Sequence, residues 1–287
     1  MEFVDLHCHS TASDGTLAPD EVVRVAKQNG LVGLALTDHD TVAGVPGAAT
    51  EAHRVGIAFI AGIEISCEYP RPGTMHLLGY GIDPDNPTLR DMTKTLIDGR
   101  NKRNEKMIAR FNEIGIPLTM EKVLEQSGDG VIGRPHFAAA LMKMGVVSTI
   151  AEAFKTYLGQ GGRVYFDKER LSPKQAIEMI RQAGGLTVLA HPSQLQKENN
   201  AQLENAIKEL IDYGLAGVEV IHSDHRESLI DFLSELADKY HLLKTGGSDF
   251  HGSNKPHISL GKAGSRRIPR QFMDELLARH TATKKAS

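Results

Sequence analysis

The sequence lacks most of the features that mark secreted or membrane-spanning proteins. It has only two cysteines, Cys8 and Cys67, too few for a disulfide framework. Because both lie in apolar stretches, we expect core thiols in a reducing compartment. No apolar run approaches the length of a membrane span, and Asp5 interrupts the N-terminus before the apolar region of a secretory signal could form. We therefore expect a cytoplasmic protein without membrane contact.

A large excess of charge of either sign is also missing. The formal net charge is -3, so any contact with nucleic acid would have to come from a local basic patch. The sequence indicates no obligate protein partner. Hydrophobic residues make up 40% and charged residues 24% of the 287 residues, which is typical of a globular protein with one large domain or two modest ones.

Strands and helices alternate at both ends of the chain. A short apolar stretch at Val4 leads into a helix over 18–30, followed by a strand from Leu31, a helix over 44–56 and a strand over 57–67. From Ser172 the alternation resumes, with helices over 172–185, 201–214, 225–240 and 269–280. Repeated strand–helix units predict an α/β fold with parallel strands, either a closed barrel or a doubly wound sheet. In both, functional residues gather at the carboxyl ends of the strands.

The middle of the chain interrupts this alternation. Between about residue 84 and residue 162 the sequence is helical and shows no convincing strand. We therefore predict a helical insertion over 84–162 that caps the active site of a barrel built from 1–83 and 163–287.

The opening stretch VDLHCHSTASDG places two histidines and an aspartate within eight residues. His7 and His9 are two positions apart at the end of a short strand, so their side chains point to the same side and Cys8 points away. Two imidazoles on one face are commonly held by a metal ion. On this stretch alone, two histidines satisfied by hydrogen bonds remain an alternative.

Histidines and carboxylates recur at the downstream ends of the other strands. A random scatter of the 13 histidines would not select the same end of successive units, so we predict a metal site whose nitrogen and oxygen ligands suit Zn, Mn or Fe. Six imidazoles and three carboxylates are too many for one ion, so two or three divalent ions would share them. Glu64, on an otherwise apolar strand, is the best candidate bridge, because a carboxylate can bind two cations. The nine candidates are His7, His9, Asp14, His39, Glu64, His76, His191, Asp249 and His251.

The motifs HCHSTASDG, LTDHD, GIEIS, MHLLGY, LAHP and GSDFHG together resemble those of the polymerase and histidinol phosphatase (PHP) family. The resemblance covers both barrel segments and implies a distorted (β/α)7 barrel with a trinuclear metal site. The insertion, followed by LAHP and VEVIHSDH, is similar to the branch described as nucleoside 3',5'-bisphosphate phosphatases and 5'-to-3' exoribonucleases. By this resemblance one ion is held by His7, His9, Glu64 and Asp249, a second by Glu64, His76 and His191, and a third by Asp14, His39 and His251.

Clustered cations favour hydrolysis of a phosphate ester. Two or three ions lower the pKa of a bridging water, which yields a metal-bridging hydroxide, and they neutralise the phosphoryl oxygens in the transition state. Pro135 suits the first position of a helix, which places Arg134 at a helix N-terminus where an anion is favoured. We predict that Arg134 clamps the phosphate. His222 ends a strand without matching a ligand position, and it would bind substrate phosphate, protonate the leaving oxygen or support a ligand.

A bisphosphate or an RNA 5' end needs a second anion site and a surface for the base. We expect basic and aromatic residues of the insertion and its exit to provide them beside the mouth of the barrel, although a basic helix face is often only a solvated surface. The predicted substrates are pAp-like nucleoside 3',5'-bisphosphates and the 5' ends of short oligonucleotides. The alternatives are histidinol phosphate and a non-catalytic metal-binding module. The expected basic and aromatic residues are Lys102, Lys106, Arg110, Arg163, Tyr165 and Phe166.

Overall fold

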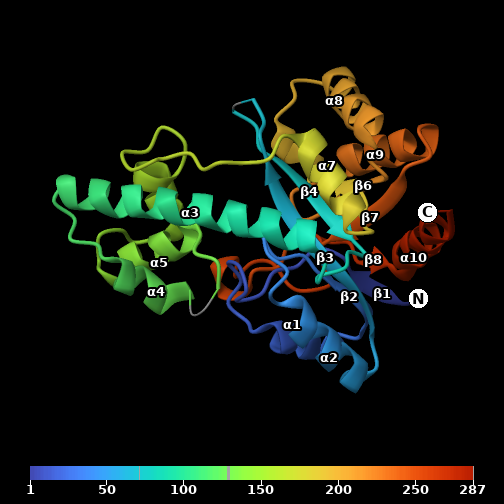
Figure 1. The fold of residues 1–287 in the computed structure, drawn as a ribbon, viewed down its shortest axis with the longest axis horizontal. Coiled ribbons are helices and arrows are strands. Elements are labelled where there is room, and N and C mark those ends of the chain that lie inside the picture. The colour runs from blue at the N-terminus through green and yellow to red at the C-terminus, as the bar shows by residue number, and fades with distance from the viewer. Residues whose placement is uncertain (71, 128–129, 287) are drawn as a thin grey trace.

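Eight strands in the described part of the chain form one mixed sheet that curls into a barrel. The structure is a computed structural model that describes residues 1–70, 72–127 and 130–286. Figure 1 shows the strands among surrounding helices, with a helical lobe to one side. Neighbouring strands follow the order β7-β6-β5-β4-β3-β2-β1-β8. The strands are β1 (Phe3–Asp5), β2 (Leu31–Leu36), β3 (Ala58–Cys67), β4 (Met75–Tyr80), β5 (Leu186–Leu189), β6 (Gly217–His222), β7 (Leu243–Gly247) and β8 (Ile268–Pro269).

The barrel closes where the chain leaves β1 and meets β7. The backbone N–H of Leu6 donates to the carbonyl of Gly246 over 3.2 Å, and the N–H of Asp249 donates to the carbonyl of His7 over 2.9 Å. Strands β1 to β7 therefore complete the circuit, and the two-residue strand β8 pairs antiparallel with β1. The expected distorted (β/α)7 barrel is confirmed.

The expectation that all strands run parallel is wrong for β4. This strand is antiparallel to both β3 and β5, whereas β1-β2-β3 and β5-β6-β7 pair in parallel. The cause is the short connection from Cys67 to Met75, which has room for a hairpin but not for a crossover of about a dozen or more residues. As a result the start of β4 lies at the rim where the parallel strands end, and His76 stands there.

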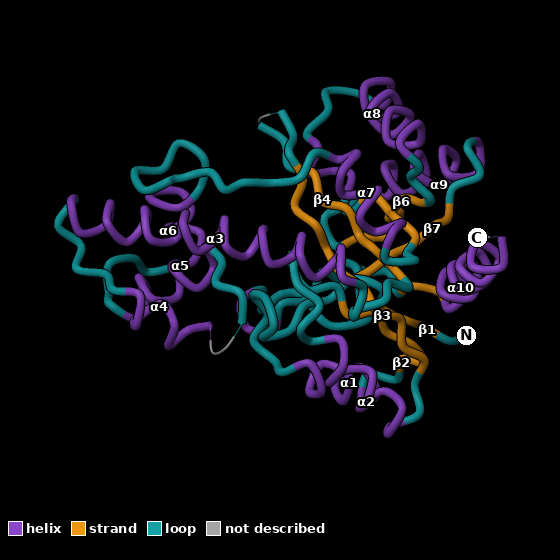
Figure 2. The backbone as a smooth tube through the Cα atoms, viewed as in Figure 1, coloured by secondary structure: helices purple, strands orange, loops and turns teal. Residues whose placement is uncertain are grey.

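Helices cover the outside of the barrel, and two of them begin at side-chain caps. Ser172 Oγ accepts the N–H of Gln175 over 3.3 Å, with Pro173 at the start of the helix, and Asn199 Oδ1 accepts the N–H of Gln202 over 3.0 Å. Figure 2 shows these helices outside the orange strands. None of the helices in the described ranges combines the length and apolar character needed to cross a membrane. The outer helices are α1 (Pro19–Gln28), α2 (Val45–Val55), α7 (Pro173–Gln182), α8 (Asn200–Tyr213), α9 (Glu227–Lys239) and α10 (Arg270–Ala286), with 3₁₀ turns η2 (Pro192–Leu195) and η3 (Gly252–Asn254).

The helices between β4 and α7 form a lobe with its own hydrophobic core. The long helix α3 (Pro87–Glu113) extends from beside the barrel into the lobe (Figure 1). The rings of Phe111 and Phe137 stack inside the lobe with centroids 6.4 Å apart. The lobe also contains α4 (Met120–Ser127), α5 (Arg134–Lys143), α6 (Ile150–Ala153) and the π-helical turn η1 (Phe154–Leu158). The expected insertion boundaries at 84 and 162 stay a prediction.

Both cysteines are buried in the barrel. Cys8 is 0% and Cys67 3% exposed, and neither forms a disulfide. The Cys8 Sγ donates to the carbonyl of Ala35 over 3.3 Å. Burial raises the pKa of both thiols, so they remain protonated. The expectation of core thiols is confirmed, and the reducing compartment stays a prediction.

Gly247 in β7 lies against the chain of β1 where the barrel closes. A Cβ added there would come within 2.2 Å of the Cβ of His7 and 2.5 Å of its backbone nitrogen, so the backbone would have to move. We expect Gly247→Ala to lower the free energy of unfolding by about 3 kcal/mol or more in urea denaturation. The control is Gly47→Ala in α2, where the nearest atom would be 3.9 Å away and alanine should be neutral or stabilising. Equal stability of the two variants would contradict closure at Gly247.

Candidate metal centre

The side chains predicted as metal ligands meet at one rim of the barrel. His7 and His9 follow β1, Glu64 lies in β3, His191 follows β5 and Asp249 follows β7. They meet because the parallel strands end at the same rim, to which the antiparallel strand β4 adds its start. We call this group the histidine–carboxylate cluster, and it contains His7, His9, Asp14, His39, Glu64, His76, His191, Asp249 and His251.

Glu64 is the centre of the cluster. Its side chain is fully buried, and its Oε1 lies 2.9 Å from both His76 Nδ1 and His191 Nε2. Its Oε2 lies 2.9 Å from His39 Nδ1, and neither of these two atoms has a hydrogen-bond partner among the residues described. Both carboxylate oxygens thus face imidazole nitrogens, as expected of a bridging ligand. Within 3.4 Å of one or other oxygen are nitrogens of His7, His9, His39, His76 and His191.

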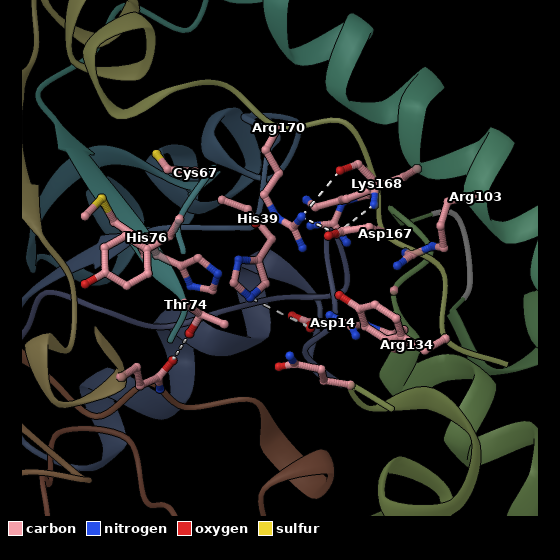
Figure 3. Close-up of a pocket in the computed structure, with 18 of the residues that line it drawn as sticks. Asp14, His39, Cys67, Thr74, His76, Arg103, Arg134, Asp167, Lys168 and Arg170 are labelled. Atoms are coloured by element: carbon pink, nitrogen blue, oxygen red, sulfur yellow. Dashed lines mark hydrogen bonds and ion pairs between the residues drawn. The ribbon is translucent and has the colours of Figure 1, made fainter. Parts of the chain in front are cut away.

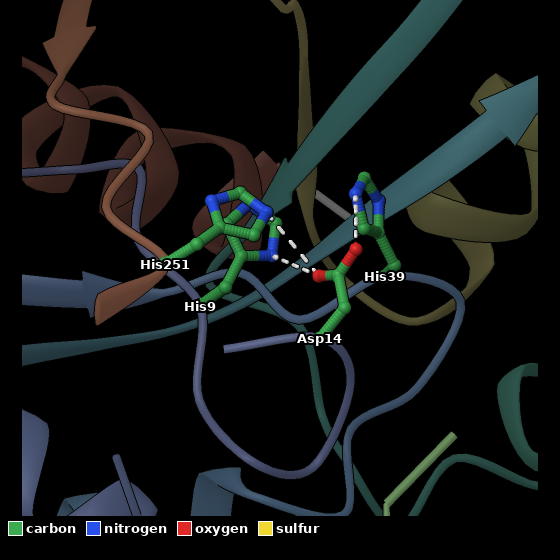
Figure 4. Close-up of side chains that lie close together, drawn as sticks. All are labelled: His9, Asp14, His39 and His251. Carbon is green, nitrogen blue, oxygen red and sulfur yellow. Dashed lines mark ion pairs between the residues drawn. The ribbon is translucent and has the colours of Figure 1, made fainter. Parts of the chain in front are cut away.

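Asp14 gathers a second set of rings, which Figure 4 shows. Its Oδ1 lies 3.2 Å from His251 Nε2 and 4.0 Å from His9 Nδ1, and its Oδ2 lies 3.9 Å from His39 Nε2. The rings of His9 and His251 stack with centroids 4.0 Å apart. One atom from each of these four residues lies within 4.8 Å of the others, which is the spacing of candidate ligands around one ion.

Asp249 gathers a third set, which includes His222. Its Oδ1 lies 3.3 Å from His9 Nε2 and 3.6 Å from His7 Nε2, and its Oδ2 lies 3.5 Å from His222 Nε2. His222 is 2% exposed, and its Nδ1 accepts the N–H of Asp224 over 3.1 Å. The structure groups His222 with His7 and Asp249 as a candidate ligand, a position that the sequence did not give it. Because a neutral ring whose Nδ1 accepts an N–H carries its proton on Nε2, this arrangement directs Nε2 as a donor toward Asp249.

The cluster fits metal ions better than it fits hydrogen bonding. Many of its buried nitrogens and oxygens have no hydrogen-bond partner in the described ranges, although they face one another. An unsatisfied buried polar atom costs about 1–3 kcal/mol, so cations that several of these atoms share would remove a large penalty. The unpartnered atoms are His7 Nε2, His9 Nδ1 and Nε2, Asp14 Oδ1, His39 Nδ1, Glu64 Oε2, His191 Nδ1 and His222 Nε2.

Burial gives two imidazoles the protonation state that metal binding requires. Burial, and after it the charge of His251, lower the pKa of His9 to about 3, and burial lowers the pKa of His76 to about 4. A neutral imidazole is the form that binds a metal ion. Burial alone would raise the pKa of Glu64, but the charges of His39 and His7 hold it well below its usual value. His9 and His76 are therefore neutral donors beside an ionised carboxylate. Against the effect of burial, Glu219 and Glu64 raise the pKa of His7, and Glu64 and Asp14 raise the pKa of His39, so these two rings must lose a proton when they bind a metal ion.

Glu219 supports the cluster, although the sequence did not single it out. It is fully buried in β6, its Oε1 lies 3.0 Å from His7 Nδ1, and its Oε2 accepts the N–H of His191 over 2.7 Å. A carboxylate against the second ring nitrogen orients a metal-binding imidazole and sets its tautomer. The available signal was a glutamate between two valines in GVEVIH, which is the same pattern that singled out Glu64.

A cavity of about 370 Å³, the mouth cavity, opens beside the cluster. His39, His76 and Asp14 line one part of it, and basic side chains line another (Figure 3). These basic side chains come from α3, from the start of α5 and from the segment that leads back to the barrel. We call them the cationic wall, which consists of Arg100, Arg103, Arg134, Lys168 and Arg170.

Among the residues described, the five side chains of the cationic wall are accompanied by two carboxylates, Asp40 and Asp167, of which Asp167 contacts Arg170, so positive charge remains in excess. Asp40 is fully buried and pairs with two of its members: Arg100 donates to Oδ2 over 2.6 and 3.0 Å, and Lys168 contacts the same oxygen. Burial alone would raise the pKa of Asp40, but Lys168 and Arg100 hold it well below its usual value. Burial, and then the charge of Arg100, lower the pKa of Arg103 to about 9. Arg103 is 4% exposed, and its Nη2 has no hydrogen-bond partner among the residues described.

The basic residues that the sequence predicted on α3 are not among those described at the cavity. Lys102, Lys106 and Arg110 are exposed on α3 and are absent from the described lining of the mouth cavity. Arg100 and Arg103 line it from the face of α3 that carries the buried residues of the lobe. Residues three or four apart share a helix face, so extending the apolar face of this helix toward its N-terminus would have found both arginines.

Arg134 lies at the start of α5 and against the mouth cavity, as the sequence indicated. Its Nη1 donates to the carbonyl of Leu158 over 3.1 Å, and its guanidinium lies 5.3 Å from the centre of the Tyr165 ring. Tyr165 also lines the cavity, whereas Arg163 and Phe166 do not appear in the part of its lining that the structure describes. The position of Arg134 suits an anion clamp, and that role stays a prediction.

Similar proteins agree on one family and differ in the substrates for which they are named. The PHP domain model matches residues 5–214. A 3',5'-nucleoside bisphosphate phosphatase from Chromobacterium violaceum is 35% identical over 91% of this chain and 91% of its own length. A 5'-3' exoribonuclease from Haemophilus influenzae is 35% identical over 86% of this chain and 89% of its own length. A phosphoribosyl 1,2-cyclic phosphate 1,2-diphosphodiesterase from Eggerthella lenta is 32% identical over 88% of this chain and 97% of its own length. A solved structure described as a metal-dependent phosphoesterase from Bifidobacterium adolescentis gives a TM-score of 0.87 at 31% identity, covering 97% of this chain and 96% of that one.

The central position of Glu64 leads to a prediction about metal content. Because its two oxygens face different imidazoles, Glu64→Gln should weaken more than one ion site at once, since an amide lacks the charge and the second anionic oxygen. We expect the variant to lose at least one bound ion per chain by elemental analysis, and to lose most of the rise in Tm that added Mn²⁺ or Zn²⁺ gives the wild type. Glu68→Gln is the control, because Glu68 is exposed just beyond the end of β3. Unchanged metal content in Glu64→Gln would rule out the bridging role.

Proposed function

This chain belongs to the PHP domain family and is a metal-dependent phosphoesterase, and on that premise we propose that it acts on nucleoside 3',5'-bisphosphates and on the 5' ends of short oligonucleotides. Two relatives named as a bisphosphate phosphatase and an exoribonuclease support this proposal. A third relative, named for a cyclic phosphodiester, shows that family membership alone does not select the substrate. The choice of substrate therefore rests on the mouth cavity.

In this proposal the histidine–carboxylate cluster holds two or three divalent ions of Mn, Zn or Fe, which its nitrogen and oxygen donors suit. His222 is a further candidate ligand beside Asp249. When bound, such ions supply positive charge for the phosphoryl oxygens and lower the pKa of a water molecule toward neutrality. The proposed sets are His7, His9, Glu64 and Asp249 for one ion, Glu64, His76 and His191 for a second, and Asp14, His39 and His251 for a third.

The observation that carries the choice of substrate is the unbalanced charge of the cationic wall. Asp40 is shared by Arg100 and Lys168, and the buried Nη2 of Arg103 has no partner among the described residues. One phosphate at the cluster would leave this positive charge unmatched. A ligand with a second phosphate would match it, and a nucleoside 3',5'-bisphosphate carries two phosphates on one ribose.

The chain's own residues would bind and orient such a substrate. Asp40 holds Arg100 and Lys168 at the cavity, so that their positions do not depend on the ligand. Arg134, supported by the carbonyl of Leu158, would clamp a phosphate with the remaining hydrogens of its guanidinium. His222 lies against Asp249 and is absent from the described lining of the mouth cavity, which favours support of the metal ligands over contact with the leaving group.

The same charge argues against histidinol phosphate. Histidinol carries an ammonium group, and placing it among five cationic side chains would be unfavourable. A non-catalytic metal-binding module is excluded as well, because the relatives that match most of this chain are named as enzymes.

Removing Arg134 should separate phosphate binding from folding. We expect Arg134→Ala to retain its metal content and fold but to lose about 10²-fold or more in kcat/KM for adenosine 3',5'-bisphosphate, which is the scale of a strong transition-state contact. The control is Arg110→Ala, because Arg110 is exposed in the same lobe. If kcat/KM of Arg134→Ala stayed at the wild-type value, Arg134 would have only a structural role.

Arg103 should determine the preference for a second phosphate. We expect Arg103→Met to lower kcat/KM for adenosine 3',5'-bisphosphate by about 10- to 100-fold relative to adenosine 5'-monophosphate, the scale of a hydrogen bond to a charged group. Stability should change little, because losing the hydrogen bond from Arg103 Nε to Asn104 Oδ1 is offset by removing a buried guanidinium charge whose Nη2 has no partner among the described residues. The control is Lys102→Met, the exposed neighbour on α3, which should leave kcat/KM for both substrates unchanged. Hydrolysis of histidinol phosphate by the wild type as fast as the bisphosphate would refute the nucleotide proposal and leave only the phosphoesterase.

A further inference from the structure

A second cavity, the side cavity, adjoins the mouth cavity. Its volume is about 720 Å³, which is within the range of small-ligand sites. Tyr69 and Met75 line both cavities, so the two are neighbours across these side chains. The other lining residues come largely from α8 and from the connection that precedes it. A strand of nucleic acid that extended past Tyr69 and Met75 would therefore enter the side cavity.

The side cavity offers aromatic rings and an amide. Lys197 Nζ lies 5.1 Å from the centre of the Tyr69 ring. Tyr213 is 36% exposed, and its hydroxyl donates to Glu209 Oε1 over 2.9 Å, which fixes the direction of the ring. Asn205 lies one turn before Glu209 on α8 and is exposed in the same cavity. Ring faces of this kind stack on nucleobases regardless of their identity, and amides pair with base edges.

The charges of the two cavities differ, and this difference sorts the parts of a nucleotide between them. The charged residues described at the mouth cavity, apart from its histidines, are the five members of the cationic wall with Asp14 and Asp167, so cations outnumber carboxylates there. The charged residues described at the side cavity are Lys197, Glu68 and Glu209, so carboxylates outnumber cations there. A phosphate is therefore favoured in the mouth cavity and disfavoured in the side cavity. A neutral base is the part of the chain that the side cavity suits.

The buried hydroxyl of Tyr69 supports a ligand in this region. It has no hydrogen-bond partner among the residues that the structure describes. A buried hydroxyl without a partner carries a free-energy cost that a bound polar group would remove. Because Tyr69 lines both cavities, this group stands where a strand would cross from one to the other.

We propose that the side cavity binds the base of the second nucleotide of a short 5'-phosphorylated single strand, while the first nucleotide and its phosphates occupy the mouth cavity. This inference rests on the proposed function, because it extends the same substrate by one residue. It assigns Tyr213 as a stacking residue for the second base and Tyr69 as the wall that both nucleotides contact.

The test compares two substrates and two forms of the metal-loaded protein. The substrates are a 5'-phosphorylated dinucleotide and the same molecule without its second base. For the complete dinucleotide, Tyr213→Ala should lower kcat/KM about tenfold, the scale of one base–aromatic stack. For the molecule without the second base, the wild type should already show this loss and Tyr213→Ala should add none. Tyr213→Phe keeps the ring and should behave like the wild type.

Two controls accompany the test. Adenosine 3',5'-bisphosphate has no second base, so its kcat/KM should be the same for the wild type and for Tyr213→Ala. Tyr240→Ala is the matched variant, because the Tyr240 hydroxyl also donates to a glutamate of α8, Glu204, over 2.5 Å. Tyr240 is absent from the described lining of both cavities, so its removal should not change the dependence on the second base.

An equal effect of Tyr213→Ala with and without the second base, or no effect on either, would overturn the inference. The inference would also be overturned if the wild type hydrolysed adenosine 3',5'-bisphosphate but had the same kcat/KM for the dinucleotide with and without its second base. The proposed function would then stand. If neither the bisphosphate nor the dinucleotide were hydrolysed, the proposed function would fail. Titration calorimetry of the dinucleotide would then test separately whether the side cavity binds the second base. Tyr213→Ala should raise the Kd of the complete dinucleotide about tenfold and leave the Kd of the molecule without the second base unchanged.

Discussion

One buried carboxylate surrounded by imidazoles is the constraint on which the rest of this structure depends. Glu64 has no exposure to solvent, and nitrogens of five histidines lie within 3.4 Å of its oxygens. An ionised group in such a place is stable only if positive charge is held beside it. Glu219 orients His7 through the ring nitrogen that faces away from Glu64. Asp14 and Asp249 likewise face imidazole nitrogens, those of His251 and His9. The rim of the barrel is therefore built around cations.

The barrel and the lobe contribute different chemistry to one cavity. The barrel supplies imidazole nitrogens and carboxylates. The lobe supplies the cationic wall together with residues 159–172, the exit segment, which lead from the lobe back to the barrel. Asp40 joins the two parts, because it comes from the barrel and pairs with Arg100 of the lobe and Lys168 of the exit segment. A substrate is therefore met by donors for metal ions on one side and by fixed positive charge on the other, which is the arrangement that phosphate esters require.

The ligand residues and the basic wall differ in how far the sequence could locate them. The nine predicted ligands stand at strand ends, where position along the chain is nearly equivalent to position in space, and the structure brings all nine together. Their roles as ligands stay predictions. The basic residues lie on a helix, where the face that meets the cavity depends on how the helix packs. On this helix the sequence therefore selected Lys102, Lys106 and Arg110. In the structure, Arg100 and Arg103 line the cavity instead.

By itself the sequence determined the alternation of strands and helices and the residue types at the rim, because hydrophobic period, helix caps and strand ends are local properties. The pattern left a closed barrel and a doubly wound sheet open, and the barrel was implied only by the family resemblance. Tertiary structure alone decided the contact of Glu219 with His7, the face of α3 at the cavity and the junction of the two cavities at Tyr69. Each of these joins residues far apart in the chain or follows from how one element packs on another. Such relations have no periodic signal, since they are set by the free energy of the whole packed structure and not by neighbours in sequence.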